Sequence, residues 1–151
     1  MASRTAVLTL ILAACGGHPA TTPTPAFTVQ VLVADSIAHA MAQQAFDADA
    51  KLLTPDSLYL PDAEIIVNGT PRADPPRFAG IAGDGGTVQL GSSRFAVTGN
   101  YVWGTIQYRW VPADSSKRMA DGWATFVIAR VKDGSWRILH VHSSTASPQS
   151  P

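Results

Sequence analysis

Four stretches in the second half of the chain follow a two-residue period, and two of the gaps between them carry turn signals. The stretches cover residues 87–97, 101–111, 122–132 and 135–143. Thr98-Gly99-Asn100 separates the first two, and Asp133-Gly134 separates the last two. Such pairs between strand-like segments are typical of tight β-hairpins. The sequence therefore predicts an antiparallel sheet, with shorter strands at 64–67 and near Phe78.

The segment 101–111 is apolar on both of its faces. Tyr101 and Trp103 fall on one face. The other face receives Val102, Ile106, Tyr108 and Trp110. A sheet with one wet face would alternate more cleanly between apolar and polar residues. We therefore expect both faces to be covered, one by an N-terminal helix and the other by a second subunit, so that the protein is a homodimer.

A helix is predicted upstream of the strands, over about residues 28–46. Its apolar residues are spaced three and four apart, at Val29, Leu32, Val33, Ile37, Ala40, Met41 and Phe46. Asp47 and Asp49 interrupt this stripe. The pair Thr54-Pro55 ends a short second turn, because a residue before proline is disfavoured in the helical region. The apolar stripe is expected to pack on the sheet.

The first fifteen residues have the layout of a bacterial export signal. Arg4 supplies a positive charge, residues 6–12 an apolar stretch, and Ala13 and Ala14 the small residues that a signal peptidase requires. Residues 12–15 read Leu-Ala-Ala-Cys and resemble the lipoprotein signal box, in which the cysteine receives a lipid before cleavage on its N-terminal side.

This layout implies that residues 1–14 are a signal peptide and that Cys15 is the lipidated first residue of the mature protein. A flexible linker rich in glycine, threonine and proline is expected over 15–27, then one domain over 28–145 and a disordered tail over 146–151. The protein is expected in the cell envelope, held to a membrane by its lipid and facing outside the cytoplasm. The alternative is a buried helix with an incidental cysteine, which the following glycines and prolines disfavour.

Charge and cysteine content exclude several kinds of site. Lysine plus arginine equals aspartate plus glutamate at 11 each, so no basic surface for nucleic acid is predicted. The single cysteine excludes an internal disulfide and a zinc site built from several thiolates. We expect neither a cofactor nor a metal.

Two segments carry a resemblance to a known family. Residues 58–69 read Leu-Tyr-Leu-Pro-Asp-Ala-Glu-Ile-Ile-Val-Asn-Gly, and residues 133–144 read Asp-Gly-Ser-Trp-Arg-Ile-Leu-His-Val-His-Ser-Ser. With the helix before them and the long strands between them, they resemble the nuclear transport factor 2-like superfamily, in particular its SnoaL-like and ketosteroid isomerase-like members. The closing segment is also similar to the end of the calcium/calmodulin-dependent kinase II association domain.

The resemblance implies an α+β fold in which a cone-shaped, curved antiparallel sheet wraps around N-terminal helices and a pocket. It does not imply a function, because this fold serves enzymes, ligand-binding domains and assembly modules. The base of the ketosteroid isomerases would fall on Val67, which cannot take a proton. The arginines of the kinase association pocket would fall on Ser143 and Val127. Neither chemistry therefore transfers.

Histidines and carboxylates near the two segments are the candidate catalytic residues. Alternation in a strand predicts that Trp136, Ile138, His140 and His142 share one face. Either histidine could form an acid-base pair with Asp62 or Glu64. A metal is disfavoured because zinc usually takes three or four protein ligands. Ser143 and Ser144 are interpreted as polar residues at a strand end rather than as nucleophiles.

Aromatic residues are the candidate lining of a ligand pocket, because such pockets are mostly apolar. The candidates are Tyr59, Tyr101, Trp103, Tyr108, Trp110 and Trp123. Arg109 and Arg94 could bind an anion beside them.

Three functions remain open. The preferred one is a membrane-anchored envelope lipoprotein that binds a small apolar or weakly acidic molecule. The alternatives are a SnoaL-like or isomerase-like enzyme that uses a histidine and a carboxylate, and a dimerisation or assembly module.

Overall fold

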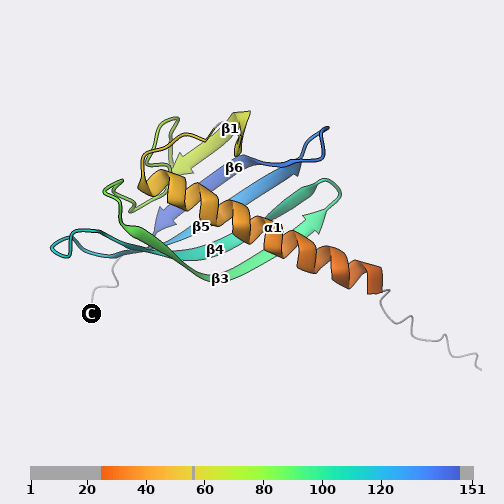
Figure 1. Cartoon of the computed structure of the whole chain (residues 1–151), viewed down its shortest axis with the longest axis horizontal. Coiled ribbons are helices and arrows are strands. Elements are labelled where there is room, and N and C mark those ends of the chain that lie inside the picture. Colours follow the sequence, from red (N-terminus) through yellow and green to blue (C-terminus); the bar gives the residue numbers. More distant parts are fainter. Residues whose placement is uncertain (1–24, 56, 147–151) are drawn as a thin grey trace, which may run out of the picture.

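One long helix crosses one face of a curved, open sheet (Figure 1). The computed structural model describes the backbone of residues 25–55 and 57–146, and the side chains from residue 35 onward. The helix α1 spans Pro25–Ala50. The strands are β1 (Tyr59–Val67), β2 (Thr70–Pro71), β3 (Thr87–Thr98), β4 (Tyr101–Val111), β5 (Ala120–Arg130) and β6 (Trp136–Thr145). The predicted α+β fold with a curved sheet is confirmed, with one helix in place of the expected helices.

The sheet order is β2-β1-β6-β5-β4-β3. Each neighbouring pair is antiparallel except β1 and β6, which run parallel. Both predicted hairpins are present, since Thr98 pairs with Tyr101 and Arg130 pairs with Trp136 across their turns. The strand predicted at Phe78 is wrong. Phe78 lies in the connection between β2 and β3, where consecutive prolines deny the backbone the donors that a strand ladder needs.

The helix is longer than its apolar stripe predicted. It begins at Pro25, inside the predicted linker, because proline fits the first turn, where backbone N–H groups have no partner inside the helix. It ends at Ala50, beyond the two aspartates that were expected to interrupt it. Asp47 is exposed, whereas Asp49 is buried. The predicted signal peptide, Cys15 and the tail from residue 147 lie outside the described residues.

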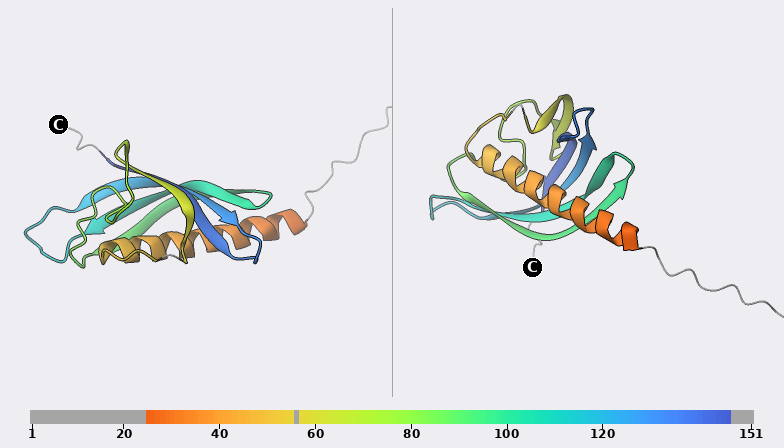
Figure 2. Two further views of the ribbon diagram at one scale, coloured as in Figure 1. Left: turned by 90° about the horizontal axis from the view of Figure 1, so that it is seen from above. Right: turned by 45° about the vertical axis from the view of Figure 1, so that its right-hand side comes forward.

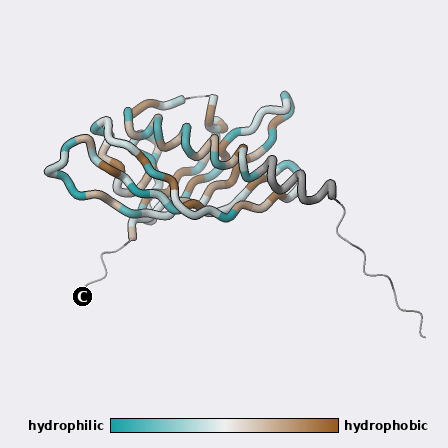
Figure 3. Tube along the Cα trace, turned by 60° about the horizontal axis from the view of Figure 1, so that its bottom comes forward, coloured by the Kyte–Doolittle hydropathy of each residue, from teal (hydrophilic) through white to brown (hydrophobic). Residues whose placement is uncertain are grey.

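The space between α1 and the sheet is filled by aromatic side chains. The Phe46 ring on α1 lies 4.1 Å from the Phe78 ring, 4.7 Å from Tyr108 and 6.1 Å from Phe126, measured between ring centroids. Hydrophobic and hydrophilic residues alternate along the strands (Figure 3). The inner sheet face is therefore a packed core.

The opposite face of the sheet has no covering element in the described part of the chain (Figure 2). Large aromatic side chains lie on it, with Tyr101 48%, Trp103 51% and Trp123 45% exposed. We call this the outer face. No helix in the described residues is both long and apolar enough to cross a membrane.

Candidate functional site

The two candidate histidines lie on the outer face, because β6 contains a β-bulge. Ile138 pairs with Ile128, but the next pair joins His140 to Val127, so Leu139 is an extra residue. An extra residue reverses the alternation of side chains along a strand. Ile138 therefore points into the core, while His140 and His142 point outward. The prediction that they share a face with Ile138 is wrong for this reason.

One predicted histidine–carboxylate pair does form. The parallel pairing of β1 and β6 sets Glu64 beside His140, and Glu64 Oε2 lies 3.3 Å from His140 Nδ1. The two side chains are 67% and 28% exposed, so water competes for the contact. Among the described residues, Asp62 forms no ion pair with either histidine. The structure thus brings together His140 and Glu64, on an open surface, and leaves His142 and Asp62 exposed.

The predicted pocket residues divide into four groups. Tyr108 and Trp110 are fully buried in the core, where the Tyr108 hydroxyl donates a hydrogen bond to the carbonyl of Ala79 at 2.7 Å. Tyr101, Trp103 and Trp123 are exposed on the outer face. Arg109 borders a depression of about 220 Å³ but is already paired with Asp121 at 2.7 Å, and Arg94 is exposed. Tyr59 alone among the predicted set borders the cleft described next.

A cleft of about 340 Å³ lies beside β1, between the end of the α1–β1 connection and the chain that follows β2. We call it the β1 cleft. Its lining is formed by Thr54, Pro55, Tyr59, Leu60, Pro61, Ala63, Ile65, Arg72, Ala73 and Arg77. The wall is mostly apolar, and it carries two arginines and no carboxylate among the described residues. This mixture is typical of small-molecule sites.

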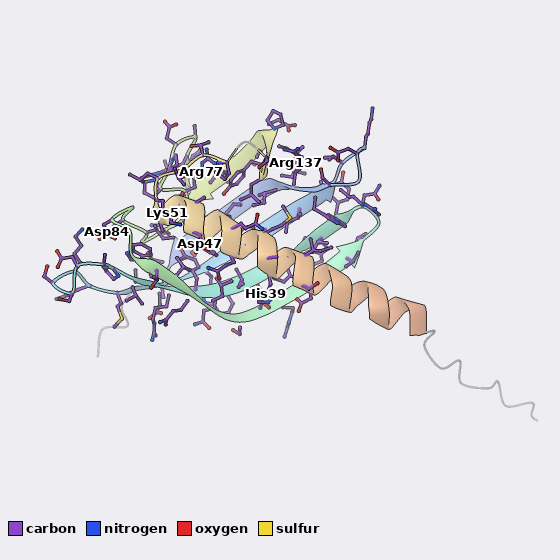
Figure 4. The ribbon with its side chains drawn as sticks, viewed as in Figure 1. His39, Asp47, Lys51, Arg77, Asp84 and Arg137 are labelled. Carbon is purple, nitrogen blue, oxygen red and sulfur yellow. The ribbon has the colours of Figure 1, made fainter. Side chains whose placement is uncertain are left out.

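Arg77 is the most constrained polar residue of the β1 cleft. Its side chain is buried, with 8% of the residue exposed. Its Nε donates a hydrogen bond to the carbonyl of Ala73 at 3.0 Å, and its guanidinium carbon lies 4.8 Å from the centroid of the Tyr59 ring. Such stacking of a cation on an aromatic face is attractive. Figure 4 shows Arg77 next to β1, near the end of α1 that carries Asp47 and Lys51.

Asp49 fixes the backbone on which Arg77 sits. Its carboxylate, 2% exposed, accepts the Arg77 N–H at 2.7 Å (Oδ1) and 2.6 Å (Oδ2), and the Phe78 N–H at 2.9 Å (Oδ2). Burial raises the pKa of Asp49 to about 6, against the opposing effect of these N–H groups and of the Arg77 and Arg72 charges. A third contact, from the Ala79 N–H to the buried Ser143 Oγ at 3.0 Å, holds the same segment.

The sequence contained a signal for Asp49 that the prediction missed. Asp49 follows Phe46 by three residues and Ala45 by four, so a continuous helix places it on the core face. Burial also raises the pKa of Tyr59 to about 12, so Tyr59 is a neutral phenol near neutral pH. No comparable signal marks Arg72 and Arg77, which lie in a segment without periodicity.

Comparisons with known proteins identify the fold. No protein-family model matches the chain, and no curated protein matches it significantly. Several solved structures do. A nuclear transport factor 2-like protein with a cystatin-like fold from Novosphingobium aromaticivorans is 17% identical, with 89% of this chain and 95% of that chain covered and a TM-score of 0.58.

Two further solved structures differ in the function named for them. A candidate ketosteroid isomerase from Parabacteroides distasonis is 16% identical, with 76% of this chain and 89% of that chain covered and a TM-score of 0.53. A candidate calcium/calmodulin-dependent kinase II association domain from Xanthomonas campestris is 20% identical, with 79% and 88% covered and a TM-score of 0.53. At these identities the shared property is the fold, and the resemblance drawn from residues 58–69 and 133–144 is confirmed at that level. The chain has the nuclear transport factor 2-like fold.

Proposed function

We propose that this chain is a lipid-anchored envelope protein whose nuclear transport factor 2-like domain binds a small molecule in the β1 cleft. The observation that carries the proposal is the cleft itself, an opening of about 340 Å³ with an apolar wall and a few fixed polar groups. Asp49 stabilises one side of the cleft, because its carboxylate on α1 accepts hydrogen bonds from the backbone N–H groups of Arg77 and Phe78.

Binding is better supported than catalysis. The His140–Glu64 pair is on the outer face and is not part of the lining of the β1 cleft, although Glu64 lies between Ala63 and Ile65, which do line it. A general base works on a substrate held within hydrogen-bond reach, and this exposed pair borders neither the β1 cleft nor the depression beside Arg109. The aromatic interior of the domain offers no such space either, since Phe46, Phe78 and Phe126 pack against one another there.

Filling the β1 cleft tests this proposal. Ala63 lines the cleft, so Ala63→Trp should occupy it and remove the ligand. We expect native mass spectrometry of the purified wild type to show an added small-molecule mass that denaturation releases, and the variant to lack it. Ala113→Trp, on the exposed β4–β5 connection, is the matched control and should keep the ligand. A ligand retained by Ala63→Trp would contradict the site, and a wild type that binds nothing in a compound screen would contradict the function.

The outer face favours a second role, the formation of a homodimer. Three large aromatic residues about half exposed on one sheet face are more than isolated surface residues, and a second copy of the chain would bury them. Trp103→Lys would place a charge in that interface. We expect analytical ultracentrifugation to show a dimeric wild type and a largely monomeric variant, whereas Met119→Lys, on the exposed β4–β5 connection, should remain dimeric. A wild type that is monomeric at every concentration measured would rule the dimer out.

A further inference from the structure

The charges in the β1 cleft are unbalanced. Arg72 and Arg77 both line it, and neither forms a salt bridge with any residue in the part of the chain that the structure describes. Arg109 and Lys117 are paired with Asp121 and Asp84, and the described cations without a salt bridge outside the cleft include Arg94 and Arg118, which are exposed to water. Arg77 differs from these because it is buried, and a buried guanidinium whose charge is only partly offset is costly, so a bound anion would relieve that cost.

The buried Asp49 offsets part of this positive charge. Its carboxylate is close enough for the Arg77 and Arg72 charges to act on its pKa, but its oxygens accept hydrogen bonds from the backbone N–H groups of Arg77 and Phe78 and form no salt bridge with either guanidinium. Tyr59 is a neutral phenol near neutral pH and adds no negative charge. Two arginine charges and one buried carboxylate leave one positive charge in and behind the cleft for a ligand to meet.

The geometry separates a charged end from an apolar one. The hydrogen bond from Arg77 Nε to Ala73 and the stacking on Tyr59 fix the plane of the guanidinium, and a planar, fixed guanidinium suits a carboxylate. Arg72 is exposed at the rim, where its Nη1 lies 3.5 Å from the carbonyl of Pro76. The remaining wall includes Thr54 and several apolar residues, among them Leu60 and Ile65.

We infer that the ligand of the β1 cleft is a small organic monocarboxylate, with its carboxylate between Arg77 and Arg72 and its apolar body against Tyr59 and Ile65. The inference rests on the proposed function, because it names the ligand class of that same cleft. A monoanion fits better than a dianion, since a second charge would have to be desolvated against an apolar wall.

Octanoate and its neutral analogue octanamide, titrated calorimetrically into the full domain, test the inference. We expect octanoate to bind about tenfold more tightly than octanamide, because a hydrogen bond to a charged group is about that strong. Arg72→Met and Arg77→Met should each weaken the binding of octanoate by about tenfold and leave the binding of octanamide unchanged. Arg118→Met, an exposed arginine outside the cleft, is the matched control and should change neither.

The outcomes separate the inference from the function on which it rests. If octanoate and octanamide bind equally and the arginine variants behave as wild type, the inference of a carboxylate ligand is contradicted, but the proposal that the cleft binds a small molecule is not. If neither probe binds the wild type, both are contradicted. Tighter binding of octyl phosphate than of octanoate would overturn the choice of a monocarboxylate. Arg77 is buried, so its replacement could disturb the fold. Arg72 is exposed, and we expect Arg72→Met to unfold at the same temperature as the wild type.

Discussion

Asp49→Leu is expected to lower the free energy of unfolding by about 4 kcal/mol near pH 4, because it leaves two buried N–H donors without an acceptor. The donors belong to Arg77 and Phe78, and leucine is close to aspartate in size, so the loss would come mainly from the missing hydrogen bonds. Urea unfolding followed by circular dichroism measures it. Asp47→Leu, two residues away and exposed, is the control and should change the free energy by less than about 0.5 kcal/mol.

The loss caused by Asp49→Leu should depend on pH in a defined direction. The pKa of Asp49 is raised from 3.8 to about 6 in the folded protein, so between these values the folded state binds more protons than the unfolded state. The contribution of Asp49 to stability therefore falls as pH rises through this window and stays constant above it. We expect the deficit of the leucine variant to shrink by about 2 kcal/mol between about pH 4 and pH 7.

A second variant separates the acceptor from the charge. Asp49→Asn keeps one oxygen that can accept the Arg77 and Phe78 N–H groups but does not titrate. It should be more stable than Asp49→Leu, and wild type should lose stability relative to it as pH rises from about 4 to about 7. A constant difference between wild type and Asp49→Asn over that range would show that Asp49 is not ionising in a buried site.

Cys15→Ser is expected to move nearly all of the protein from the membrane fraction to the soluble fraction. Acyl chains bind a bilayer by about 0.8 kcal/mol for each buried methylene, so loss of the lipid removes the anchor. Western blotting of sedimented membranes measures the distribution, and the intact mass of the wild type should include the lipid. Thr21→Ser, in the predicted linker, is the control and should stay with the membrane. Unchanged fractionation of Cys15→Ser would refute the lipid anchor.

Features decided by local chemistry were predictable from the sequence. The Thr98-Gly99-Asn100 and Asp133-Gly134 turns define their hairpins, because only a few residue types accept the backbone angles of such turns, and Gly99 and Gly134 do have positive φ values of 58° and 86°. The helix α1 begins three residues before the predicted start at residue 28. Proline disfavours the interior of a helix but is favoured in its first turn, so Pro25 does not exclude a helix that begins there.

Features decided by contacts between distant segments were not predictable. The bulge at Leu139 reverses the faces of His140 and His142, and the residue types in that strand do not predict a bulge. The Asp49–Arg77 contact joins a helix to a residue 28 positions later, and it depends on the path of the chain after β2. The pattern of paired histidines and aromatic residues therefore predicts Tyr59 but neither Arg72, Arg77 nor Asp49.

The length of α1 has a consequence for the position of the β1 cleft in the proposed lipid-anchored protein. The helix has 26 residues and runs from Pro25, ten residues beyond Cys15, to Ala50 (Figure 1). Its C-terminal end carries Asp49, which holds the backbone of Arg77 at the cleft. At 1.5 Å per residue the helix is about 39 Å long, more than the thickness of a hydrocarbon layer. In the proposed lipid-anchored protein, a helix of this length would act as a spacer between the linker and the end of the domain that carries the cleft. The proposed ligand would then be captured from the aqueous phase of the envelope rather than extracted from the lipid.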